Sequence, residues 1–280
     1  MRTVALAAVL AVLVAAPASA DWVKLDDFEG DLSNWTVTWY ADPGKTTTSG
    51  IVDDPDLDPG NKVLWIDDPS AGSGTDAGHN LYLDLGDDNI ADGATGTLFG
   101  RMRTGGPLAE TDGHFGVSAL AAPAAWGDFS AYMSNPGNAG WQVRDTVGTT
   151  STYHTTDQQP DNQTWINFWI VVDNFNDKYH VYFTTTYGED AEALSDNMTW
   201  GGADSTFAFR GGTGALDMQT LLVRASHTNA DGWYLDDLYI DSSSQNLSNP
   251  LGAVPEPGTL LLLGTGLIGA FGYLRRRRMC

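Results

Sequence analysis

The chain has 280 residues, 36 of them acidic and 14 basic, and a formal net charge of −22 at pH 7. A surface this acidic repels nucleic acids and anionic lipids and attracts divalent cations, so the composition excludes a nucleic-acid-binding protein. The single cysteine, Cys280, excludes a disulfide within the chain.

The first twenty residues have the pattern of a secretory signal peptide. Met1-Arg2 gives a short positive region, residues 4–16 are apolar, and Ala18-Ser19-Ala20 forms a small-residue cleavage site. We therefore predict that a signal peptidase removes residues 1–20, which leaves Asp21 at the start of the mature protein.

Three features follow one another at the C-terminus. Pro255-Glu256-Pro257 comes first, then the uncharged run TLLLLGTGLIGAFGYL over residues 259–274, then Arg275, Arg276, Arg277 and Arg278. As a helix the apolar run would reach about 24 Å, slightly less than a hydrocarbon core about 30 Å thick, so we predict a transmembrane helix with local thinning of the bilayer. The positive-inside rule places the arginines in the cytoplasm and the rest of the chain outside.

This order of features resembles the PEP-CTERM sorting signal of Gram-negative bacteria that make exopolysaccharide. The resemblance implies that an exosortase in the inner membrane cuts near residues 255–257 and passes the upstream part to the cell surface or matrix. An ordinary tail anchor with a basic stop is the alternative. We expect transient anchoring in the inner membrane, with exosortase and signal peptidase as the processing partners.

Short apolar stretches bounded by Gly, Asp and Pro predict an all-β domain over residues 21–241. One short helix is predicted at residues 189–194, and Ser242–Ala253 is predicted to be a linker that leads to the sorting signal at 254–280. The predicted strands, in chain order, are residues 22–29, 63–66, 81–85, 98–103, 115–120, 141–144, 165–173, 178–186, 206–209, 221–224 and 233–241.

Three of these segments carry a second resemblance. The opening Asp26-Asp27-Phe28-Glu29-Gly30, the hairpin over 165–186 and the closing YLDDLYID over 234–241 are similar to segments of the concanavalin A-like lectin and laminin-G superfamily. The resemblance implies a jelly roll of two antiparallel sheets, with the first and last strands side by side.

That superfamily includes retaining glucanases, so an enzyme has to be considered. Such glucanases carry their carboxylates on an E-x-D-x-x-E run, and none of the five glutamates here begins one. No G-x-S-x-G motif is present either. We therefore expect no enzyme, but an exported surface or matrix protein with a structural or exopolysaccharide-associated biofilm role. A carbohydrate-binding module is the alternative, and a glycan-active enzyme is the least favoured class.

The hairpin provides the candidate ligand site. Ile166, Phe168, Ile170 and Val172 alternate onto one face, which we expect to lie in the core. The opposite face carries a mixed aromatic and polar set that suits a polysaccharide groove, namely Trp165, Asn167, Trp169, His180 and Tyr182. The alternative is that a loop covers this face and makes it a second core. Trp126, Tyr132 and Trp141 lie in Gly-, Ala- and Pro-rich surroundings that indicate partly exposed loops.

A calcium site is the candidate metal site. If the first and last strands pair, Glu29 and Asp236 come close together and could hold a structural Ca²⁺ with backbone carbonyls. The acidic turn over residues 54–60 departs from EF-hand spacing, and no two histidines have zinc-ligand spacing. No cofactor is required by this interpretation.

Overall fold

The computed structural model describes residues 22–40, 48–56, 60–67, 78–106, 112–136, 140–147, 150–155, 161, 163–191, 206–210, 216–225 and 232–252. The predicted signal peptide and sorting signal lie outside these ranges, as do residues 192–194 of the predicted helix. Within the ranges, no helix is long and apolar enough to cross a membrane.

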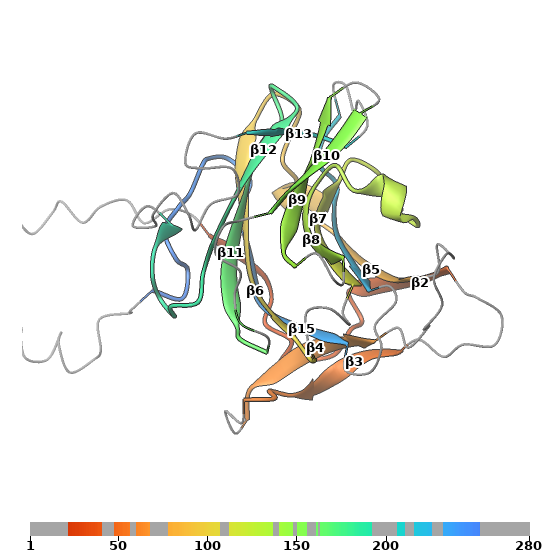
Figure 1. Ribbon diagram of the computed structural model, residues 1–280, viewed down its shortest axis with the longest axis vertical. Helices are drawn as coiled ribbons and strands as arrows, with labels where there is room; N and C mark the ends of the chain where they lie inside the picture. Colours follow the sequence, from red (N-terminus) through yellow and green to blue (C-terminus); the bar gives the residue numbers. More distant parts are fainter. Residues whose placement is uncertain are drawn as a thin grey trace, which may run out of the picture.

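One sheet has eight strands (Figure 1). Its order is β13-β12-β11-β6-β15-β4-β3, with β1 also paired to β15, and every pairing is antiparallel. The strands are β1 (Val23–Asp26), β3 (Thr48–Asp53), β4 (Lys62–Asp67), β6 (Thr95–Thr104), β11 (Ile166–Asp173), β12 (Lys178–Thr184), β13 (Phe207–Ala208) and β15 (Trp233–Asp241).

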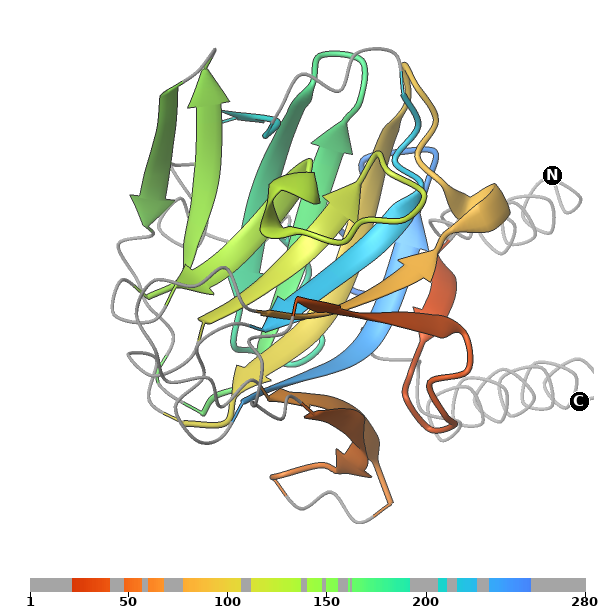
Figure 2. The same ribbon diagram turned by 90° about the vertical axis from the view of Figure 1, so that its right-hand side faces the viewer.

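The second sheet has seven strands in the order β10-β9-β8-β7-β14-β5-β2, again all antiparallel. Figure 2 shows this sheet in front of the other one, with the short 3₁₀ turn η3 (Trp126–Asp128) over its outer face. The strands are β2 (Trp35–Tyr40), β5 (Gly78–Asp84), β7 (Asp112–Ser118), β8 (Ala131–Pro136), β9 (Gln142–Val147), β10 (Thr150–Thr155) and β14 (Thr220–Ala225), and a further 3₁₀ turn, η1, spans Gly86–Asp88.

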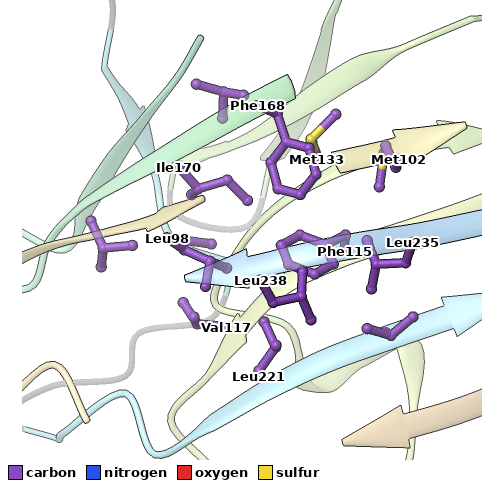
Figure 3. Close-up of a cluster of buried hydrophobic side chains, with 14 of the residues drawn as sticks. Leu98, Met102, Phe115, Val117, Met133, Phe168, Ile170, Leu221, Leu235 and Leu238 are labelled. Atoms are coloured by element: carbon purple, nitrogen blue, oxygen red, sulfur yellow. The ribbon is translucent and has the colours of Figure 1, made fainter. Parts of the chain in front are cut away.

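The core lies between the two sheets. Side chains alternate along a strand, and in the strands that form the core the inward residues are mainly apolar, as are Leu98 and Met102 of β6. Phe115 of β7 and Phe168 of β11 meet edge to face with ring centroids 4.7 Å apart (Figure 3). All four residues of the predicted core face of the hairpin are fully buried, as the alternation indicated. The sandwich formed by residues 22–252 thus contains its own core and can be expressed as one unit.

The expected pairing of the two end strands is confirmed. β1 runs antiparallel to β15, with Val23 opposite Ile240 and Lys24 opposite Tyr239. A β-bulge interrupts β15 between Asp236 and Tyr239, where Asp237 has a left-handed φ of 51°. The prediction of an all-β, two-sheet jelly-roll sandwich therefore agrees with the structure.

Residues 242–252 differ from the linker that we predicted. They pack on the outer face of the eight-stranded sheet, where Leu247 and Leu251 contact a cluster around Phe99 and Trp169. Asn246 and Asn249 are 4% and 6% exposed, and Asn249 donates a hydrogen bond to the carbonyl of Glu189. The Ser- and Asn-rich composition that suggested flexibility instead supplies side chains that hydrogen-bond to the neighbouring backbone.

Candidate functional site

The predicted ligand residues on the hairpin do not form one open surface. Trp169 is fully buried, and its indole N–H donates to the carbonyl of Ser248 at 3.0 Å. Asn167 is buried and donates to the carbonyl of Thr186. The alternative that we considered, a covered second core, therefore describes this part of the face, because residues 242–252 lie over it.

The other three predicted residues separate into two places. Trp165 is partly exposed and lies under the Arg101 guanidinium, 4.9 Å from the ring centroid. His180 and Tyr182 stack on each other with centroids 4.3 Å apart. They line a pocket of about 330 Å³, together with Thr95, Val171, Asp173, Lys178, Tyr179, Thr206 and Gln245.

The predicted calcium ligands have protein partners. Glu29 accepts a hydrogen bond from the backbone N–H of Lys62, and Asp236 accepts one from the amide of Asn61 and lies 3.5 Å from the Arg101 guanidinium. The described residues contain no cluster of three metal-ligating side chains. A calcium ion at Glu29 and Asp236 stays a prediction.

The outer face of the seven-stranded sheet brings polar and aromatic residues together. His114 on β7, Tyr132 on β8 and Arg224 on β14 alternate with core residues and so point outward. Trp126 on η3 packs against the cluster that contains Tyr132, with its ring centroid 6.1 Å from that of His114. We call the group formed by Trp126, Tyr132, Arg144, Tyr153 and Arg210 the arginine–tryptophan cluster.

Two guanidinium groups share one indole in this cluster. The Arg210 guanidinium lies 3.5 Å from the Trp126 ring centroid and that of Arg144 lies 4.9 Å from it. Arg144 also lies 5.7 Å from the ring of Tyr153, whose side chain is 44% exposed. Trp126, Arg144 and Arg210 are themselves partly exposed, so the cluster reaches the surface.

The backbone holds each member of the cluster in place. The Asp128 carboxylate accepts hydrogen bonds from the backbone N–H groups of Ala124 and Ala125, which fixes the turn that carries Trp126. The backbone N–H of Arg210 donates to the carbonyl of Ser130, and its guanidinium donates to the carbonyl of Trp126. The backbone of Arg144 donates to and accepts from the hydroxyl of Tyr179, which reaches across from β12.

A glycine makes room for Tyr132. Gly116 lies directly opposite Tyr132 in the sheet, and a Cβ at Gly116 would lie 2.1 Å from the carbonyl oxygen of Ala131 and 2.6 Å from Cβ of Tyr132. Any larger residue would push β8 away from β7, and Tyr132 with it.

Several polar atoms in this region are buried without a hydrogen bond in the part of the chain that the structure describes. They are Nδ1 of His114, Nε1 of Trp126, the hydroxyl of Tyr132, Oγ of Ser134, and Nε and Nη1 of Arg144. Burial raises the pKa of Tyr132 to about 12, and the neighbouring Arg144 and Arg210 partly oppose that shift. The Tyr132 hydroxyl is therefore neutral at pH 7 and remains a hydrogen-bond donor.

The sequence indicated only part of this cluster. Of the three aromatic residues that we predicted on loops, Trp126 is partly exposed on η3, but Tyr132 is buried on β8 and Trp141 is 4% exposed beside β9. Arg144 and Arg210 were not identified, because no local pattern links two arginines from separate parts of the chain. The sequence feature that could have indicated them is the scarcity of basic residues. In a protein this acidic, each arginine is a candidate for a specific role.

Comparison with known proteins identifies the C-terminal segment. Residues 253–278 match the PEP-CTERM protein-sorting motif, which implies export and sorting by an exosortase. No curated protein is significantly similar to this chain in sequence.

Among solved structures, a sialidase superposes with a TM-score of 0.50 at 9% identity, over 81% of this chain and 19% of the sialidase. A family 11 carbohydrate-binding module from Clostridium thermocellum, in complex with a β-1,3-1,4-mixed-linked tetrasaccharide, gives a TM-score of 0.40 at 12% identity, over 80% of this chain and 98% of the module. The Emp47p carbohydrate recognition domain gives a TM-score of 0.40 at 12% identity, over 76% of this chain and 90% of that domain.

The chain spans only 19% of the first of these structures, and at such identities the likeness concerns the fold alone. The fold and the sorting motif together describe the molecule: it is a jelly-roll β-sandwich that carries a PEP-CTERM protein-sorting motif at residues 253–278.

Proposed function

We propose that the sandwich is a polysaccharide-binding module, displayed at the cell surface or in the extracellular matrix, and that its ligand binds on the outer face of the seven-stranded sheet. The sorting motif supports the location. The observation that supports binding is the arginine–tryptophan cluster, where aromatic rings and two partly exposed guanidinium groups lie together at the surface.

The chemistry of this cluster suits a sugar. A pyranose presents C–H groups on its faces and hydroxyls around its edge, so it pairs with flat rings and with hydrogen-bonding side chains. Tyr153 offers an exposed ring, and Trp126 beside it is partly exposed but is stacked by Arg210. Buried polar atoms without partners are rare in native proteins and are a mark of functional sites.

The outer face of the eight-stranded sheet is the less suitable of the two faces. Residues 242–252 cover the rings of Phe99 and Trp169. Arg101 is bound to Asp237 at 3.0 Å, so its charge is compensated within the protein. A binding role is also consistent with the absence of the glucanase carboxylate run from the sequence.

Affinity gel electrophoresis of residues 22–252 tests the proposal. We expect at least one polysaccharide in a panel of neutral and acidic polymers to retard the protein, and Trp126→Ala to weaken that binding about fivefold or more, which corresponds to about 1 kcal/mol. Trp165→Ala is the matched control, because it removes an indole stacked by an arginine on the opposite face. Retardation by no polymer, or a loss confined to Trp165→Ala, would show that the seven-stranded sheet is not the binding face.

A further inference from the structure

Arg144 and Arg210 differ in their ion pairs from the arginines of the eight-stranded sheet. On the eight-stranded sheet, Arg101 pairs with Asp237 at 3.0 Å and Arg103 with Asp56 at 3.2 Å. In the arginine–tryptophan cluster, neither Arg144 nor Arg210 has a carboxylate within ion-pair distance among the described residues. Acidic residues outnumber basic ones 36 to 14, so two arginines that stack on one indole and have no ion-pair partner among the described residues stand out.

The stacking geometry leaves hydrogen-bond donors available. A guanidinium that stacks on an indole uses its flat face, so its N–H groups remain around the edge of the plane. Arg210 uses Nη1 for the carbonyl of Trp126, and Arg144 uses Nη2 for the hydroxyl of Ser151. Each arginine has five N–H donors. Nε and Nη1 of Arg144 have no acceptor among the described residues but are buried, so a ligand would meet the partly exposed remainder of the two guanidinium groups.

The two charges are also unfavourable to each other. Burial lowers the pKa of Arg210, and the positive charge of Arg144 adds to this effect, although the nearby Tyr132 opposes it. An anion bound beside the two guanidinium groups would relieve this repulsion and could accept hydrogen bonds from their exposed N–H groups.

We propose that this site selects acidic polysaccharides, and that Arg144 and Arg210 together bind the carboxylate of a uronic acid residue while Tyr153 and Trp126 contact the sugar. The planar guanidinium matches a carboxylate in two parallel hydrogen bonds, which makes arginine the fitting residue for this group. This inference rests on the proposed function, since it names the class of polysaccharide that the same face binds.

The test compares one polymer in two charge states. Residues 22–252 are run in affinity gels that contain polygalacturonate or its fully methyl-esterified, neutral form, with EDTA present so that a divalent cation cannot bridge acidic protein and acidic polymer. We expect at least tenfold tighter binding of the acid form. Each glutamine variant loses a charge-assisted hydrogen bond to the carboxylate, so Arg144→Gln and Arg210→Gln should each weaken that binding about tenfold or more and leave binding of the ester unchanged.

Two further variants control for charge and folding. Lys178→Gln removes one positive charge from the exposed end of β12 and should not affect binding, since Lys178 lies on the other sheet. Arg144→Lys keeps the charge but loses the planar fork, so it should fold normally and show an intermediate loss. Thermal unfolding would reveal a glutamine variant that fails to fold. In that case, polymer binding by Arg144→Lys still tests the role of Arg144.

The outcomes separate the two proposals. Equal binding of acid and ester forms, with no effect of the arginine variants, overturns acid selection but leaves a polysaccharide-binding module. Binding of the acid form only when Ca²⁺ replaces EDTA also overturns it, because a cation then makes the contact. Failure to bind either form or any other polymer overturns the proposed function itself.

Discussion

At the residue scale, Asp236 is a buried carboxyl group whose pKa is strongly shifted. It lies beside the β-bulge of β15 and is 1% exposed. Burial and, to a smaller extent, the neighbouring Asp237 raise the pKa of its carboxyl to about 7, although the contacts with Asn61 and Arg101 oppose the shift. Burial also raises the pKa of Asp237, which shares Arg101 with it.

This shift predicts how stability depends on pH. The folded state holds the Asp236 proton up to about pH 7, whereas the unfolded chain releases it near 3.8. Protonation therefore favours the folded state, and this contribution, on the order of 4 kcal/mol, is lost as the pH rises from about 4 to about 7. The free energy of unfolding, measured with urea at pH 5, 6, 7 and 8, should fall as the pH rises. This fall should be smaller in Asp236→Asn than in the native protein. The exposed control Asp87→Asn should keep the native slope, and an equal slope in all three proteins would contradict the assignment.

At the element scale, the alternation of residues predicted the hairpin well. Residues 166, 168, 170 and 172 were assigned to the core from their period of two, and all are buried. The same pattern could not show what covers the opposite face, because the cover comes from Ser248 and its neighbours, which are distant in sequence. The alternation of residues shows which face of a strand is apolar. It does not show what packs on the other face, because that depends on tertiary structure.

The same limit applies to the arginine–tryptophan cluster. Arg144 reaches it from β9, Trp126 from η3, and Arg210 from the segment after β13. Their meeting follows from the sheet order, which no local spacing encodes. Trp126 was identified because Gly and Ala around it indicated a loop.

The docked segment at 242–252 leads to a prediction of its own. A protein that ends at residue 241 would expose the rings of Phe99 and Trp169, and burial of each such side chain contributes about 1.5–3 kcal/mol. We expect the free energy of unfolding to fall by about 3 kcal/mol or more relative to residues 22–252, with a red shift of tryptophan fluorescence. Gln245→Ala, which alters an exposed side chain of the same segment, should change little. Equal urea midpoints for the long and short proteins would mean that the segment contributes no stability.

At the scale of the whole molecule, the two ends predict how the protein matures. Protein isolated from the cell surface should lack residues 1–20 and Arg275–Arg278, because each end carries a cleavage signal beside an apolar run. Intact-mass measurement checks this. Changing Pro255 and Pro257 together to Ala should leave the tail attached. A surface protein that retains the arginines contradicts sorting, and loss of the tail despite both substitutions would show that the prolines are not recognised.

The docking of residues 242–252 also fixes an orientation. The chain leaves the sandwich at Gly252 on the side of the eight-stranded sheet, and η3 with Trp126 lies on the opposite side (Figure 1). Only two residues, Ala253 and Val254, separate Gly252 from Pro255, a reach of about 10 Å when extended. A molecule tethered through this end therefore turns the arginine–tryptophan cluster away from the surface that holds it, towards polymers from the surroundings or from neighbouring cells.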